Sequence, residues 1–211
     1  WKRPDANLVR LPAPGWVPAH WRPRLSFDRK WVTRGRWHAM PFTWNLNELS
    51  ILDTSTGHAV GPVIRLDQIV DSSLCADRRS VAVISQQGNA GLLSFYDVVS
   101  GELSLPATEL DSPPCSVAAR PGHPQVAVLW QNGMQLVFDA RDGKCIRELT
   151  HPNWWWDNEH YTRSARVDWS PDGTALVSVT ARGEVFVRDA ETGSERFAPI
   201  LLSPKRGVCS A

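Results

Sequence analysis

The sequence contains little cysteine. Its 211 residues include four cysteines, at positions 75, 115, 145 and 209, and no two of them form a CxxC pair. Thiolate zinc sites are usually built from such pairs, so we expect no zinc site. All four cysteines lie in or beside apolar runs, as free buried thiols do, which favours a reducing compartment and hence a cytoplasmic location.

Membrane and catalytic signatures are missing as well. No run of about 18 apolar residues occurs, so we expect no membrane span. The chain has no GxSxG elbow, no Gly-rich phosphate loop and no kinase signature. His151, Asp157, Glu159 and His160 are capable of metal ligation, but their spacing matches no template such as HExxH. We therefore predict no catalytic residue, no metal and no cofactor.

Charge of one sign is not in excess. The formal net charge is +1, so no global field points to nucleic acid or to a membrane surface. Residues 1–40 nevertheless hold nine Lys or Arg against two Asp. One interpretation is a solvated basic face, and the sharper one is a docking patch for an acidic partner. Single-stranded nucleic acid is a less favoured partner, for which stacking rings would come from Trp16, Trp21, Trp31 and Trp37.

What the sequence does contain is a repeat. In four segments, apolar residues are followed by Asp, then three residues, then Gly, and these segments are spaced 42 to 50 residues apart. The Asp–Gly pairs are Asp53 and Gly57, Asp97 and Gly101, Asp139 and Gly143, and Asp189 and Gly193. A second turn signal precedes each pair, at Asp28, Asp77, Gly122 and Asp172, and is clearest in SPDG, which ends at Gly173. Two independent signals with one period indicate a repeat architecture.

Each repeat unit reads as four short antiparallel strands, a to d. Segments such as RVDWS, ALVSV and EVFVR alternate or cluster apolar residues over a few positions, which predicts strands. SPDG and DAETG predict tight turns, because Pro presets φ, Asp bonds the local backbone and Gly tolerates positive φ. No stretch of about 10 to 12 residues has helical periodicity with caps. The prediction is an all-β chain.

This period and turn pattern resembles the WD-repeat family of β-propellers, whose repeats run about 40 to 45 residues. The resemblance covers residues 20–211 and implies a partial propeller of about four four-stranded antiparallel blades. Residues 1–20 would be an irregular basic lead-in or the remnant of a preceding blade, and a further blade would begin at 200–211. The sequence departs from the family where a Trp normally precedes the Asp, having instead Leu52, Tyr96, Phe138 and Arg188.

The sequence of the turns also looks like that of propellers in multidomain bacterial proteins, some of which carry a serine/threonine kinase domain. The chain begins at Trp1 rather than Met and its last residues look like the start of another repeat. We therefore expect a fragment of such a protein.

Two aromatic-rich insertions interrupt the repeat. Residues 151–163 join strand d of one unit to strand a of the next, and residues 35–48 join strands b and c of the first unit. Exposed tryptophans are typical of protein-binding hot spots, whereas the alternative is a lid that packs on the blades. The candidate partner-binding residues are Trp37, His38, Phe42, Trp44, Trp154, Trp155, Trp156 and His160. Trp130 and Trp169, by contrast, lie in predicted strands and are expected in the core.

The predicted function is that of a non-catalytic protein–protein interaction scaffold that uses the loop face of a propeller. Its protein partner is not specified by any motif. Two alternatives stay open: a sensor or docking segment of a larger bacterial serine/threonine kinase, and a nucleic-acid-binding propeller that uses the basic N-terminal stretch.

Overall fold

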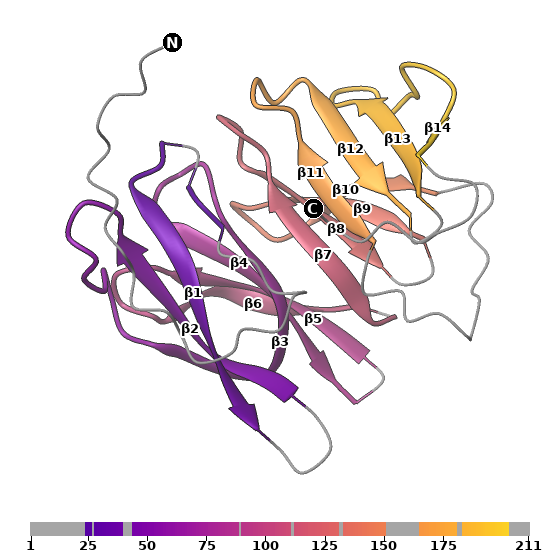
Figure 1. Cartoon of the computed structure of the whole chain (residues 1–211). Helices are drawn as coiled ribbons and strands as arrows, with labels where there is room; N and C mark the ends of the chain where they lie inside the picture. Colours follow the sequence, from indigo (N-terminus) through magenta and orange to yellow (C-terminus); the bar gives the residue numbers. More distant parts are fainter. Residues whose placement is uncertain are drawn as a thin grey trace.

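A computed structural model describes residues 24–26, 28–39, 44–88, 90–110, 112–130, 133–150, 165–180 and 183–202. For residues 34–39 and 44–46 it describes the backbone only. Over these ranges the regular elements are all β-strands, and they contain no helix (Figure 1). Every strand pair is antiparallel. The prediction of an all-β antiparallel chain is therefore confirmed.

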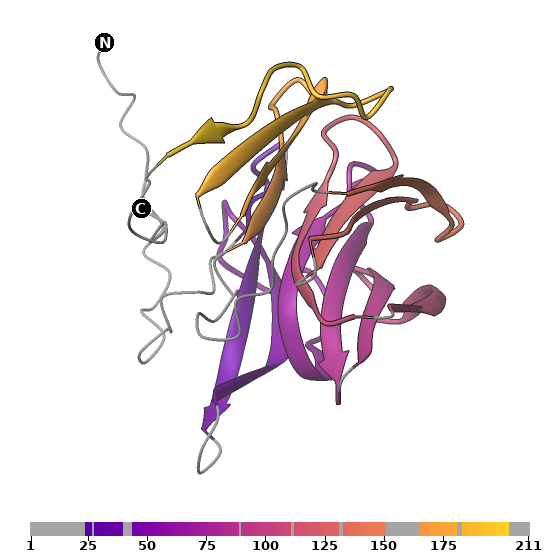
Figure 2. The same cartoon turned by 90° about the vertical axis from the view of Figure 1, so that its right-hand side faces the viewer.

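The strands form three sheets that follow one another in chain order (Figures 1 and 2). The first sheet holds β1 (Trp31–Ala39), β2 (Trp44–Asp53), β3 (Ile64–Leu74), β4 (Ser80–Gln87), β5 (Ala90–Asp97) and β6 (Leu103–Leu110). The second holds β7 (Pro114–Ala119), β8 (Gln125–Trp130), β9 (Gln135–Asp139) and β10 (Cys145–Leu149). The third holds β11 (Arg166–Trp169), β12 (Ala175–Val179), β13 (Glu184–Asp189) and β14 (Ile200–Leu201).

The first sheet has six strands because β3 belongs to two groups of strands at once. Its first half pairs with β2, for example Ile64 with Leu49. Its second half pairs with β4, and the register shifts between Ile69 and Asp71. Gln68, just before this shift, has a φ of 47°. An irregularity of this kind bends a strand without ending it, so two repeats that the sequence predicts as separate sheets are joined by one strand.

The core lies between successive groups of strands and is built by strict alternation along the central strands. In β4, Val81 and Val83 enter one apolar cluster and Ala82 and Ile84 enter the next. In β8, Val126 and Val128 pack toward the first sheet, whereas Ala127 and Leu129 pack toward the third. Successive side chains of a strand point to opposite faces. These central strands are therefore apolar on both sides because both sides are covered.

The Asp–Gly turns have one geometry in all four repeats. The amide of each Gly donates to the carbonyl of the Asp four residues before it, at 2.8 to 2.9 Å. The φ angles of these glycines lie between 71° and 76°. The Asp side chain accepts the amide two residues on, as from Val99 to Asp97 and from Glu191 to Asp189. An Asp that bonds its own local backbone stabilises a turn without any distant partner.

The two turns of each repeat are joined to each other. The residue after the Asp donates its amide to a carbonyl of the preceding turn, as Val98 does to Arg79 and Ala190 to Thr174, at 2.8 and 3.0 Å. Thr54 and Ala140 make the equivalent bonds in the other two repeats. The a–b and c–d turns of a repeat therefore lie at the same end of its strands.

One boundary differs from the sequence analysis. The predicted connection at 35–48 is largely a paired hairpin, in which Trp37 and His38 lie within β1 opposite residues of β2. Strand β14 pairs with β13 as the outer strand of the third sheet. Most of the segment 200–211, in which a further unit is expected to begin, lies outside the described residues. Trp130 and Trp169 lie in the core, as expected, with 3% and 6% of their surface exposed.

Candidate functional site

Polar side chains gather where the first strands of the repeats meet. We call segment 24–26 and the strands β3, β7 and β11 the inner strands, since β7 contacts both β3 and β11. Asp71, Ser116 and Arg166 hold equivalent positions on them, each four residues before the first turn of its repeat. A polar residue therefore recurs at one position of these three strands.

Asp71 is the hub of this group. Its side chain is 6% exposed, and its Oδ2 accepts hydrogen bonds from Arg24 Nη2 at 3.1 Å and Ser116 Oγ at 3.1 Å. The amide of Val117 donates to the same oxygen at 3.2 Å, and Arg166 Nη1 lies 3.6 Å from it. One buried carboxylate thus joins residues from all four repeats. A buried charge is tolerated when it is paired and hydrogen-bonded in this way.

Arg24 lies between two acids. Its Nη1 is 3.5 Å from Asp168 Oδ2, on β11, in addition to its bond with Asp71. The Asp71 carboxylate raises the pKa of Arg24, an effect that outweighs the opposing effect of burial. Asp168 is 70% exposed, so the pair extends from the buried hub toward solvent.

A cavity of about 320 Å³ opens beside this pair. Its polar lining comes from Arg24, Asp168, Ser73 and Arg120, and its apolar lining from Leu25, Leu74, Ala76, Ala119 and Pro121. We call it the axial pocket. Ligand cavities range from about 300 to 1,000 Å³, so the axial pocket is at the small end of that range.

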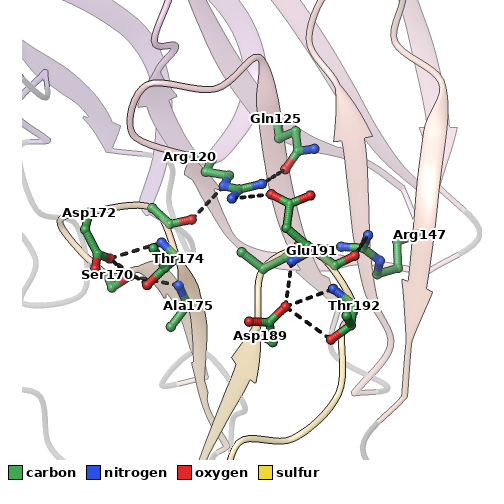
Figure 3. A network of polar contacts seen from close by, with 12 residues as sticks. Arg120, Gln125, Arg147, Ser170, Asp172, Thr174, Ala175, Asp189, Glu191 and Thr192 are labelled. Carbon is green, nitrogen blue, oxygen red and sulfur yellow. Dashed lines mark hydrogen bonds and ion pairs between the residues drawn. The ribbon is translucent and has the colours of Figure 1, made fainter.

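Arg120 lines the pocket. It also bonds residues of the second and third sheets and so links the two (Figure 3). It is 3% exposed, and its Nε donates to the Gly173 carbonyl at 2.7 Å. Its Nη1 donates to Gln125 Oε1 at 2.7 Å, and its Nη2 lies 2.6 Å from Glu191 Oε1. The guanidinium also lies 5.4 Å from the centre of the Trp169 ring. The fixed fork of donors in Arg suits several acceptors at once.

Two more arginines join the same two sheets. Arg147 Nη1 donates to the Ala190 carbonyl at 2.6 Å, and Arg147 also bonds the Glu191 carbonyl. Arg188 reaches back to Gln135 Oε1 at 3.1 Å, and burial lowers its pKa. The orientation of the third sheet on the second is therefore set by directional bonds as well as by apolar packing.

The turn aspartates are strongly acidic for structural reasons. The bond from Arg79 lowers the pKa of Asp97 to about 2, and the bond from Ser170 lowers that of Asp172 to about 2. The backbone amide of Thr192 is the main cause for Asp189, whose pKa is also about 2 (Figure 3). A carboxylate that accepts such bonds is stabilised in its charged form, so these groups are fixed anions rather than proton carriers near neutral pH.

The structure describes none of the side chains that the sequence analysis names as candidates for partner binding. Phe42, Trp154 to Trp156 and His160 lie outside the described residues. Trp37, His38 and Trp44 lie in β1 and β2, where only the backbone is described. Sequence reasoning did not find Arg24, Asp71, Asp168 or Arg120. The available signal was the polar residue that recurs at one phase of the a strands, at positions 71, 116 and 166.

Within the described ranges, no group of three or more His, Cys, Asp or Glu is placed so that it could hold a metal ion. The same part of the chain contains no helix that is long and apolar enough to cross a membrane.

Comparison with known proteins identifies the fold but no family. No family model matches the sequence, and no curated protein matches it. Among solved structures, a hydrazine synthase from Kuenenia stuttgartiensis matches 85% of this chain with a TM-score of 0.61 and 15% sequence identity. The chain spans 48% of that protein's chain, about half its length. At this identity the likeness concerns the fold alone.

Proposed function

We propose that this protein is a non-catalytic protein–protein interaction scaffold of the β-propeller type, with WD-repeat-like blades. The four joined pairs of turns correspond to four blades in this proposal. The six-stranded sheet then counts as two blades that share β3. The proposal is supported by the repeated turn geometry and by sheets that pack face to face in chain order.

The observation that carries the proposal is the axial pocket. Its arginines are already bonded to acids and carbonyls, so the surface around it is preorganised. Preorganised surfaces favour binding, because little freedom is lost when a partner docks. Leu25 adds an apolar side chain at the pocket that is 58% exposed. The tryptophan-rich segment 151–163 remains a second predicted contact for the same partner.

Affinity capture with two variants tests the proposal. Leu25→Lys places a positive charge at the pocket, and the triple replacement of Trp154, Trp155 and Trp156 by Ala removes the predicted aromatic contact. We expect each variant to lose partners captured by the wild-type chain while keeping its thermal midpoint. Ile146→Lys is the matched control for Leu25→Lys, since Ile146 is 45% exposed on the outer strand β10.

The proposal requires at least one protein that both the wild-type chain and the Ile146 variant capture. If no such protein is found, the proposal fails. A collapse of the thermal midpoint in the triple variant would place these tryptophans in the core. It would remove segment 151–163 from the proposed binding surface.

A further inference from the structure

The cationic donors that face the axial pocket are already engaged. All three nitrogens of Arg120 have acceptors, in Gly173, Gln125 and Glu191, at 2.6 to 2.7 Å. Both terminal nitrogens of Arg24 face carboxylates, those of Asp71 and Asp168. A ligand that needs a strong cationic donor would therefore have to displace an existing partner.

The acceptor in the pocket has capacity left. Among the described residues, Oδ1 of Asp168 accepts only its neighbour's amide, from Trp169 at 2.9 Å, and Oδ2 has the 3.5 Å contact with Arg24. A carboxylate offers about four lone-pair sites, and this one is 70% exposed. Among the charged side chains that line the axial pocket, the unused acceptor capacity thus belongs to Asp168.

We infer that the axial pocket receives a basic side chain, lysine or arginine, of a protein partner, with its cationic head on Asp168. The inference rests on the proposed function and names the chemistry of the partner. Leu25 and Pro121 in the pocket lining give the aliphatic stem an apolar surface. Long basic side chains combine an apolar stem with a charged head in this way.

An acidic side chain fits the same pocket less well. It would have to bond Arg24, whose guanidinium holds the buried charge of Asp71 at 3.1 Å. Weakening that pair leaves a buried carboxylate without its main counter-charge, which is strongly unfavourable. A cavity of about 320 Å³ also suits one side chain rather than a large cofactor.

Peptide binding to the full chain tests the inference. The probes are acetyl-Gly-Gly-Lys-Gly-Gly-amide and its counterparts with norleucine or Glu in place of Lys, titrated by NMR of backbone amides. We expect the Lys peptide to shift the amides of Ala119 and Trp169 and to weaken as salt is raised. Norleucine keeps the stem and loses the charge, so that peptide should bind about tenfold more weakly, the effect of about 1.4 kcal/mol.

Asp168→Asn keeps the shape of the side chain and its acceptor for the Trp169 amide. It should weaken the Lys peptide about tenfold and leave the norleucine peptide unchanged. Asp142→Asn is the matched control, because Asp142 is an exposed acid that pairs with Lys144 outside the pocket. That variant should bind like the wild type.

Equal binding of the Lys and norleucine peptides overturns the inference, as does undiminished Lys binding by Asp168→Asn or tighter binding of the Glu peptide. A partner retained equally by wild type and Asp168→Asn also overturns it, although the scaffold proposal then stands. Lys binding that depends on Asp168, in a chain that captures no protein, supports the pocket chemistry and contradicts the scaffold proposal.

Discussion

Aspartates have two structural roles in this molecule, and the residues that fill the two roles differ in burial. Asp97 and its counterparts are half-buried in turns and bond amides within the next three residues. Asp71 is buried and bonds residues 45 or more positions away in the sequence. The first role is local and follows from the Asp–Gly spacing, so the sequence predicts it. The second depends on tertiary neighbours, which no local pattern specifies.

The turn aspartates make stability sensitive to acid. The pKa of Asp97 falls from its ordinary 3.8 to about 2 in the folded chain. The stabilisation is therefore complete above the unfolded value and is lost as the pH falls through the folded one. We expect the urea midpoint to fall between about pH 5 and about pH 2, and Asp97→Asn to make that fall shallower.

Urea unfolding followed by circular dichroism at several pH values measures this effect. Glu102→Gln is the control, because it removes an equal charge beside the same turn. An Asp97→Asn variant with the full acid sensitivity of the wild type would contradict the assignment.

The strands and turns are the elements that the sequence predicted best. Asp139, Gly143 and their equivalents mark every c–d turn, because this backbone shape needs a local acceptor and a left-handed residue. The union of two repeats through β3 was not predicted. Its bend at Gln68 uses a non-Gly residue with positive φ, and nothing in IRLDQIVDSSL distinguishes a bend from an ordinary strand. The length of the β1–β2 hairpin was missed because residues 35–48 interrupt the repeat and were interpreted as an inserted connection.

Two glycines share one backbone conformation but differ in the space around them. Replacing each by Ala distinguishes the penalty of a positive φ from the penalty of a steric clash. Gly143 and Gly193 have φ angles of 73° and 76°. A Cβ on Gly143 would meet nothing closer than 3.8 Å, whereas one on Gly193 would lie 2.7 Å from Leu149 Cδ2. We expect Gly143→Ala to destabilise by about 1 to 2 kcal/mol, the penalty of the left-handed region. Gly193→Ala should lower the free energy of unfolding by about 1 kcal/mol more, because the added methyl group overpacks the site.

The difference between the two free energies of unfolding, measured in urea, isolates the crowding. Equal values would mean that Leu149 moves aside at no penalty.

At the scale of the whole molecule, the polar hub and the arginine bonds between sheets fix how the layers sit on one another. Apolar packing alone tolerates small rotations, but Arg120 and Arg147 bond specific carbonyls of the third sheet. The order of the sheets was predictable from the repeat. The contacts within the hub were not, because the recurring polar residue at 71, 116 and 166 marks a position on the strands but does not say which side chains pair.

Removing the hub carboxylate should weaken the whole fold. Asp71→Asn leaves Arg24 and Arg166 without their shared counter-charge, and breaking a buried pair destabilises by about 3 kcal/mol or more. We expect a fall of that size in the free energy of unfolding, with faster amide exchange in β3, β7 and β11 together.

Asp142→Asn should change the same free energy by less than about 0.5 kcal/mol, as exposed substitutions usually do. Faster exchange confined to β3 would show that Asp71 does not connect the inner strands.

The shared strand β3 also determines where the chain tolerates a break. A cut between β6 and β7 severs a short connection and leaves both sheets with all their ladder bonds. A cut near Ile69 divides a strand whose halves are hydrogen-bonded to β2 and to β4. Two halves of this protein, produced separately, would therefore reassemble when split after the second repeat and not when split after the first.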